Sequence, residues 1–194
     1  MPAFYRLVDG TIEIDGVRMH QTVRKTPTQD AQDKVRVLGI FAGSRVLDVC
    51  TGLGYSAIAS ARRGAKVTTL ELDENVLELA KENKDSAELF SNPNITIKTG
   101  DAFESIDDFA AGSFDIVMHD PPRFSLAGEL YSLVFYQKLF RVLRRGGRMF
   151  HYTGNPGKSS GKNMTKGFKQ RLVEAGFVGV QWQEDLQGFL CRKP

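Results

Sequence analysis

The stretch RVLDVCTGLGYSAIA, residues 45–59, decides the fold of this chain. Its first six residues form an apolar run typical of a buried strand, and the residues from Tyr55 onward are typical of a helix. Between them, Gly52 and Gly54 allow a tight turn in which the backbone can approach a ligand closely. The free N–H groups at the start of the helix can face the same ligand. The stretch therefore predicts a strand–turn–helix unit with a ligand site at the turn.

Strands and helices alternate outward from this unit, which favours an α/β fold with a Rossmann-like, doubly wound and mostly parallel sheet. The expected strands cover residues 45–50, 65–72, 95–98, 114–119 and 148–154, and the expected helices cover 55–64, 73–90, 126–143 and 164–175. Two last runs, 177–183 and 188–194, predict a C-terminal antiparallel hairpin and bring the sheet to seven strands. Ligands bind beyond the carboxyl ends of parallel strands, so the loops there are expected to share one side.

The N-terminal residues predict a small addition to that core. Two Asp-Gly pairs, at 9–10 and 15–16, separate short apolar and β-branched runs, a pattern typical of a short antiparallel meander. Thr28 is the expected N-cap of a helix that ends near Leu38, before Gly39. We therefore expect a single domain over 1–194, with the meander and helix in 1–43 and the ligand-binding core in 44–194.

Composition excludes several classes of protein. The chain has 194 residues, of which 41% are hydrophobic and 25% charged, so it is neither disordered nor fibrous. It contains no apolar run of the length of about 18 residues that a membrane span needs, and its first residues do not resemble a secretory signal. Two cysteines are too few for a disulfide framework, and the three histidines show no metal-ligand spacing. We expect a cytoplasmic protein with no membrane or metal partner.

Two acids near the glycine turn indicate the ligand. Asp48 lies four residues before Gly52, where a carboxylate would repel a pyrophosphate but attract a cation. Glu71 ends the next strand, where an acid can bind both ribose hydroxyls. The pattern Gly52-x-Gly54-x-x-Ala57 also fits dinucleotide sites, so an NAD-dependent oxidoreductase is an alternative. The two acids favour an adenosine that carries positive charge, such as S-adenosylmethionine.

Four ordered segments carry a family resemblance: VLDVCTGLGYSAIA (46–59), TLELDENVLELA (69–80), IKTGDAF (97–103) and FDIVMHDPPRF (114–124). Together they resemble the class I S-adenosylmethionine-dependent methyltransferases over residues 44–153. The resemblance implies S-adenosylmethionine as the cofactor. It implies a pocket for the methionine part of the cofactor and an acid that binds the ribose. It also implies two side chains that enclose the adenine ring and an acceptor for the adenine amino group. The implied cofactor-binding residues are Asp48, Thr51, Gly52, Gly54, Tyr55, Glu71, Leu72, Asp101 and Ala102.

The segment HDPPRF, residues 119–124, predicts the chemistry. Two prolines after Asp120 remove two N–H donors, which leaves a carboxylate and carbonyl oxygens as acceptors. Acceptors suit an amine substrate, whose hydrogens Asp120 and the Pro121 carbonyl would hold while its lone pair faces the methyl group. The segment resembles the [DN]-P-P-[YFW] motif of amino-group methyltransferases, with Asp120, Pro121 and Pro122 as its catalytic residues. The larger block HDPPRFSLAGELYS resembles uncharacterised archaeal predicted methyltransferases and, more loosely, an archaeal ribosomal-RNA cytosine-N4 methyltransferase.

The motif departs from its family at one position. Arg123 stands where the family has an aromatic residue that stacks on the flat substrate. Arg123 can stack through its guanidinium and also bind a phosphate, and Phe124 can replace the ring. His119 is an alternative general base, although a histidine at a strand end is more often structural. Cys50 invites a nucleophile hypothesis, but its place in the cofactor turn favours a small packed residue.

Charge distribution bears on the substrate. Residues 141–171 contain nine Lys or Arg and no acid, whereas the whole chain has a net charge of only +3. Four arginines of this stretch are expected at a helix end and strand start, away from the ligand side: Arg141, Arg144, Arg145 and Arg148. Three lysines are expected beside the HDPPRF loop: Lys158, Lys162 and Lys166. These lysines are candidates for binding a polyanion.

The predicted substrate is an exocyclic amine of a nucleobase in RNA, namely cytosine N4, adenine N6 or guanine N2. The predicted substrate-binding residues are His119, Arg123, Phe124, Lys158 and Lys162. A small-molecule amine or a protein is the alternative substrate. An NAD-dependent oxidoreductase leaves HDPPRF unexplained, and a polyamine aminopropyltransferase would share the sheet but need an acid arrangement that the sequence does not clearly show.

Overall fold

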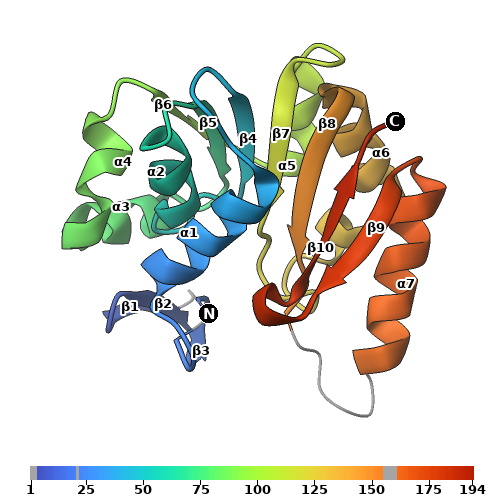
Figure 1. Cartoon of the computed structure of the whole chain (residues 1–194). Coiled ribbons are helices and arrows are strands. Elements are labelled where there is room, and N and C mark those ends of the chain that lie inside the picture. Colours follow the sequence, from blue (N-terminus) through green and yellow to red (C-terminus); the bar gives the residue numbers. More distant parts are fainter. Residues whose placement is uncertain (1–3, 21, 155–160) are drawn as a thin grey trace.

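A computed structural model describes residues 4–20, 22–154 and 161–194, with the side chains of residues 161–163 excepted. Its main sheet has seven strands in the spatial order β6-β5-β4-β7-β8-β10-β9 (Figure 1). The strands are β4 (Arg45–Val49), β5 (Lys66–Glu71), β6 (Ile95–Thr99), β7 (Phe114–His119), β8 (Leu143–Tyr152), β9 (Val178–Gln183) and β10 (Gly188–Arg192). The first five run parallel, and β10 pairs antiparallel with both β8 and β9. The predicted fold is confirmed, including the C-terminal hairpin.

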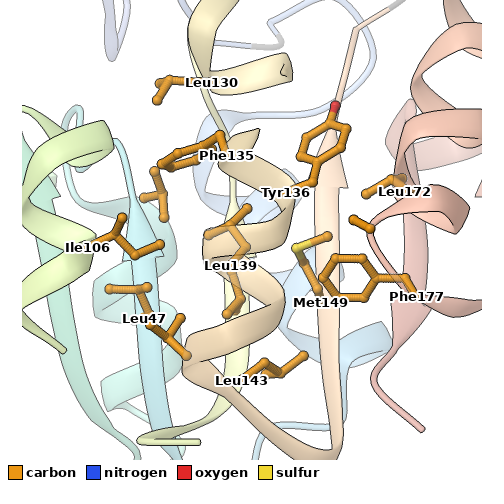
Figure 2. Close-up of a cluster of buried hydrophobic side chains, with 14 of the residues drawn as sticks. Leu47, Ile106, Leu130, Phe135, Tyr136, Leu139, Leu143, Met149, Leu172 and Phe177 are labelled. Carbon is orange, nitrogen blue, oxygen red and sulfur yellow. The ribbon is translucent and has the colours of Figure 1, made fainter. Parts of the chain in front are cut away.

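Helices cover both faces of the sheet, which makes it doubly wound (Figure 1). One face is covered by α1 (Pro27–Leu38), α2 (Tyr55–Ala61), α3 (Glu74–Glu82) and α4 (Ala87–Ser91). The other face is covered by α5 (Ala102–Ser105), α6 (Leu133–Val142) and α7 (Gly161–Glu174). Figure 2 shows how α6 packs on this second face, with Leu139 between the side chains of Leu47 and Met149 and with Phe135 nearer to Leu130. Consecutive residues of β4 alternate between the two cores, which explains its continuous apolar run.

The N-terminal residues form a separate three-stranded antiparallel sheet of β1 (Tyr5–Val8), β2 (Thr11–Ile14) and β3 (Val17–Arg18). Both Asp-Gly pairs adopt positive φ angles at its turns, as the hairpin signals predict. The sheet contacts the core through Tyr5, whose hydroxyl donates to Asp73 Oδ2 at 2.5 Å. Tyr55 adds a second contact, because its hydroxyl donates to the carbonyl of Gly10 at 2.8 Å.

The predicted cap of the first helix is wrong by two residues. Thr26, not Thr28, is the N-cap of α1, and its hydroxyl accepts from the backbone N–H of Gln29 at 3.2 Å. The Gln29 side chain accepts from the Thr26 N–H at 3.0 Å, which completes a capping box. Pro27 then occupies the first helical position, where its missing N–H costs nothing.

Two predicted helices are shorter than expected. The stretch 73–90 breaks at Asn83, whose side-chain amide donates to Tyr55 Oη at 3.0 Å and to Ser86 Oγ at 2.7 Å. The stretch 126–143 becomes a helical turn over Gly128–Tyr131 followed by α6, which Ser132 caps. Gly146-Gly147 does not end that helix but lies inside β8, where the Gly146 N–H donates to the Lys193 carbonyl at 3.0 Å.

The four arginines of 141–148 lie away from the carboxyl ends of the parallel strands, as predicted. Arg144 and Arg45 both pair with Asp115 near the start of β7, through contacts of 2.5 and 3.2 Å. Burial opposes the charge of Asp115, but hydrogen bonds from these arginines lower its pKa to about 2. This end of the sheet is therefore held by structural ion pairs. Across the described ranges, no helix is both long enough and apolar enough to cross a membrane.

Candidate active site

A cavity of about 430 Å³ lies beyond the carboxyl ends of the parallel strands. Its walls come from the loops after β4, β5, β6 and β7 and from the end of β8, so the predicted ligand side is confirmed. The N-terminal sheet and α1 close it from the other side. The N-terminal residues that line it are Tyr5, Ile12, Ile14, Met19, His20, Pro27, Asp30, Ala31 and Lys34.

The glycine turn after β4 forms one wall. Gly54 has a φ of +78°, and a Cβ there would lie 2.7 Å from Leu89 Cδ2, so a side chain does not fit. Thr51 and Tyr55 both line the cavity, and the Thr51 hydroxyl is 2.7 Å from that of Thr69. Cys50 also lines it, with a φ of 71°, and burial raises the pKa of its thiol. The thiol is therefore not ionised, which favours the packed role over the nucleophile.

Glu71 joins two of these loops. Its carboxylate accepts from the backbone N–H of Gly52 at 2.9 Å and from that of Asp73 at 3.1 Å. Burial raises the pKa of Glu71, while the two N–H groups oppose that shift. The carboxylate lies at the end of β5 and lines the cavity. It is thus fixed at the position where an acid can accept from ribose hydroxyls.

Asp48 does not line the cavity, contrary to the direct contact expected of it. The side chain is fully buried, and its two oxygens accept from the hydroxyls of Ser56 and Thr69, both at 2.7 Å. Burial raises the pKa of Asp48 to about 7, against the effect of these hydrogen bonds. Gly54 also lies behind the lining residues. Asp48 therefore connects β4, α2 and β5 beneath the glycine turn, and acts on a ligand only through them.

The expected adenine end is present as a set of side chains. Leu72, whose side chain is 66% exposed, and the buried Ala102 both line the cavity, as does Asp101. Asp101 caps α5 by accepting from the Phe103 N–H at 2.8 Å, which leaves further acceptor positions on its carboxylate. Apolar walls, an acceptor for an amino group and an acid for hydroxyls match an adenosine. The residues present therefore fit S-adenosylmethionine.

Asp120, Pro121 and Pro122 line the cavity after β7. The Pro122 carbonyl accepts from the Tyr131 hydroxyl at 2.7 Å, which ties the loop to the turn Gly128–Tyr131. The Asp120 carboxylate and the Pro121 carbonyl remain as acceptors at the cavity wall. Leu126, a residue that the sequence did not single out, supplies an apolar side chain beside them.

Lys34 lines the cavity as well, although sequence reasoning did not single it out. Its ammonium donates to Asp120 Oδ2 at 2.6 Å and pairs with Asp30 Oδ2 at 2.8 Å. Lysine is almost never buried unless it is paired, and this paired side chain is only 5% exposed. The one sequence signal is that Lys34 follows Asp30 by four residues on a predicted helix. Ion pairs on exposed helix surfaces show the same spacing, so the signal does not indicate burial. Nothing in the sequence connects it to Asp120, 86 positions away.

Three predicted substrate contacts are not at the cavity wall. His119 is fully buried and stacks on His151 with ring centroids 4.3 Å apart; burial lowers its pKa far below the usual value. Neither ring nitrogen of His119 has a hydrogen-bond partner among the described residues. This burial favours a structural role for His119 over the general-base alternative. Arg123 and Phe124 are exposed beside the cavity rather than lining it, and Phe124 packs against Tyr131 at 5.4 Å.

The predicted lysines can be followed only in part. Lys158 lies outside the described residues, and so does the side chain of Lys162. Lys166 is exposed in the first half of α7. Two residues further along, Phe168 lies 5.8 Å from the ring of Phe124. This contact brings the start of α7 beside the loop that carries Asp120.

Comparisons with known proteins agree with this geometry. Residues 46–147 match the methyltransferase domain family. An uncharacterised protein of Methanocaldococcus jannaschii is 51% identical over 98% of this chain and 67% of its own length. A putative ribosomal RNA large subunit methyltransferase of the same organism is 35% identical over 44% of this chain and 23% of its own length. The chain thus spans about a quarter of that second relative.

Among solved structures, spermidine synthase from Thermotoga maritima shares the fold, with a TM-score of 0.72 over 95% of this chain and 65% of that one. At 18% identity this likeness concerns the fold alone. The family match decides against an NAD-dependent oxidoreductase and assigns S-adenosylmethionine as the cofactor. Since the match spans about half of the chain and covers the glycine turn, Glu71 and Asp120, this chain belongs to the S-adenosylmethionine-dependent methyltransferases.

Proposed function

We propose that the protein N-methylates an exocyclic amine of a nucleobase in RNA: cytosine N4, adenine N6 or guanine N2. The observation that carries the proposal is the position of Asp120 and Pro121, which both line the cavity and carry a carboxylate and a carbonyl that can accept hydrogen bonds. The two prolines supply no N–H group that would compete for them. An NH₂ group has two hydrogens to donate, one for each acceptor.

The residues of this chain act by orienting the amine. Accepting both amine hydrogens fixes the nitrogen and localises its lone pair, which in a base is delocalised into the ring. When bound, S-adenosylmethionine would supply an electrophilic methyl group to the amine lone pair; the electrons of the broken S–C bond would stay on sulfur, and water would take the amine proton. We propose that Glu71 binds the ribose, Leu72 and Ala102 enclose the adenine, and Asp101 accepts from its amino group. Thr51, Gly52 and Tyr55 would surround the methionine side.

Charge supports a nucleobase whose phosphates stay outside the cavity. Acids dominate the cavity wall: Asp30, Glu71, Asp73, Asp101, Asp120 and Glu129, against one lysine, Lys34. Such an interior repels phosphate but accepts a neutral base. Arg123 directly follows the lining residue Pro122 and is exposed, as is Lys166 on α7, and we propose that both meet phosphates of a flipped nucleotide. The similarity to a putative ribosomal RNA methyltransferase supports RNA as the substrate.

A small-molecule amine is the second candidate. The N-terminal sheet lines the cavity through Ile12, Ile14 and Met19, so the space in front of Asp120 is confined. A confined, acidic cavity also suits a small amine. This enclosure is the observation that favours the second candidate over a protein substrate.

Transfer of a tritiated methyl group to separated fractions tests the proposal. The protein and labelled S-adenosylmethionine are incubated with total RNA, DNA, protein and small molecules from the source cells. We expect label in RNA, on a base nitrogen after digestion. Asp120→Ala is expected to reduce transfer at least 100-fold, because the amine loses an oriented, charge-assisted acceptor.

Calorimetry with S-adenosylhomocysteine serves as the control, and Asp120→Ala should bind it like the wild type. Label in small molecules would replace the first candidate by the second. Wild-type turnover by Asp120→Ala would refute the amine-orienting role for either substrate.

A further inference from the structure

Lys34 brings an N-terminal helix into the catalytic end of the cavity. Its ammonium lies between Asp120 Oδ2 at 2.6 Å and Asp30 Oδ2 at 2.8 Å. The same nitrogen lies 4.4 Å from the centroid of the Tyr152 ring, at the end of β8. Three elements that are distant in sequence, α1, the loop after β7 and β8, therefore meet at one buried cation.

The surroundings of Lys34 favour its charged form. Burial opposes the charged form, but the two carboxylates outweigh burial and raise the pKa of Lys34. A lysine that stays protonated cannot take a proton from a substrate, so it is not a general base. It can only hold its partners. Burial of an ammonium with two carboxylates is retained where the geometry they impose is needed, because such clusters add little net stability.

The contact has a direct consequence for Asp120. Oδ2 is committed to Lys34, whereas Oδ1 has no hydrogen-bond partner among the described residues. The backbone N–H of Asp120 lies 3.4 Å from the Val49 carbonyl, a weak contact that does not fix the side chain. Within the described part of the chain, Lys34 is thus the residue that holds the side chain, and one oxygen is left for a substrate.

We infer that Lys34 is a positioning residue for methyl transfer, which holds Asp120 by one carboxylate oxygen so that the other accepts from the substrate amine. The inference rests on the function proposed above for Asp120. It makes α1 part of the active site rather than a cover over the cofactor. The segment before the glycine turn would then be required for turnover, although it lies outside the matched family domain.

A double-mutant cycle with Asp120→Asn tests the inference. Lys34→Met alone is expected to lower kcat for methyl transfer on the order of 10- to 100-fold, since an oriented charge-assisted hydrogen bond is lost. In the Asp120→Asn background, Lys34→Met should cause little further loss, because its effect passes through Asp120. Lys34→Arg should restore part of the activity, since it keeps a donor and a charge. Affinity for S-adenosylhomocysteine should stay at the wild-type value throughout.

Lys34→Met leaves Asp30 unpaired and buried, which could destabilise the fold. A second variant therefore separates loss of positioning from loss of folding. Asp30→Asn/Lys34→Met removes the pair together and should show the same kcat loss with a wild-type circular dichroism spectrum. Arg36→Met is the matched control: it lies on the same helix, pairs with Asp33 and does not line the cavity. Its activity should be that of the wild type.

A reading that does not depend on turnover completes the test. In a ¹H–¹⁵N spectrum, the paired Lys34 ammonium should give a cross-peak protected from exchange, which Asp120→Asn shifts. Full activity of Lys34→Met, or equal losses with and without Asp120, would overturn the inference. Those results leave the proposed function intact as long as Asp120→Ala is inactive. An active Asp120→Ala would instead refute the proposed function itself.

Discussion

Glu71 illustrates how one side chain serves both the fold and the site. Its two oxygens accept backbone N–H groups from the glycine turn and from the start of α3, so the loops after β4 and β5 are held together. Each carboxylate oxygen has two lone pairs, which leaves room for ligand hydroxyls. A single residue thus fixes the shape of the cavity and presents an acceptor within it.

Replacing Glu71 by Ala is expected to weaken S-adenosylhomocysteine binding by about 2–3 kcal/mol, or about 30- to 150-fold, because charge-assisted hydrogen bonds are lost. Isothermal titration calorimetry measures this change. Glu74→Ala is the control, since Glu74 is exposed in the first turn of α3 and does not line the cavity. An unchanged dissociation constant for Glu71→Ala would remove Glu71 from the cofactor site.

At the scale of elements, α1 depends on a local device for its position. The capping box between Thr26 and Gln29 sets where the helix begins, with the cap four residues before Asp30. Asp30 and Lys34 are one helical turn apart on that face. A helix capped by Thr28 would begin two residues later, and the spacing between Asp30 and Lys34 would be the same.

Thr26→Ala should therefore destabilise the protein by about 1 kcal/mol, and lower its melting temperature by about 2–4 °C. Thermal unfolding followed by circular dichroism gives both values. Thr28→Ala provides the comparison, because Thr28 lies inside α1 and accepts no capping bond. If Thr28→Ala proved the more damaging change, the assigned cap would be wrong.

Across the whole molecule, the charges divide by the two ends of the sheet. At the amino ends of the strands, Arg45 and Arg144 are paired with Asp115, so they are structural. At the carboxyl ends, Arg123 is exposed next to the cavity-lining Pro122, and Lys166 is exposed on α7. The number of Lys and Arg residues in the acid-free stretch 141–171 therefore overstates how many cations can bind RNA.

If RNA is the substrate, the double variant Arg123→Gln/Lys166→Gln should weaken its binding. Each lost phosphate contact should reduce the slope of log K against log salt by about 0.7–0.9, so the two together should reduce it by about 1.5. Filter binding or fluorescence anisotropy at several salt concentrations measures the slope. Lys66→Gln/Arg145→Gln removes the same charge from the starts of β5 and β8 and should leave the slope unchanged. Equal slopes for both double variants would exclude the opening of the cavity as the phosphate-binding surface.

The sequence by itself determined the order of strands and helices, the glycine turn, the acid after β5 and the acceptor loop after β7. These features are local, because strand and helix periodicity and turn chemistry act within a few residues. Tertiary structure alone decided which side chains reach the cavity. Neighbouring residues of a strand point to opposite faces, so His119 packs against His151 while Asp120, the next residue, faces the ligand side. Lys34 and Asp120 meet only because the folded chain brings α1 over the end of β7. Because Lys34 is shielded from water there, its pair with Asp30 becomes part of a buried ion-pair cluster.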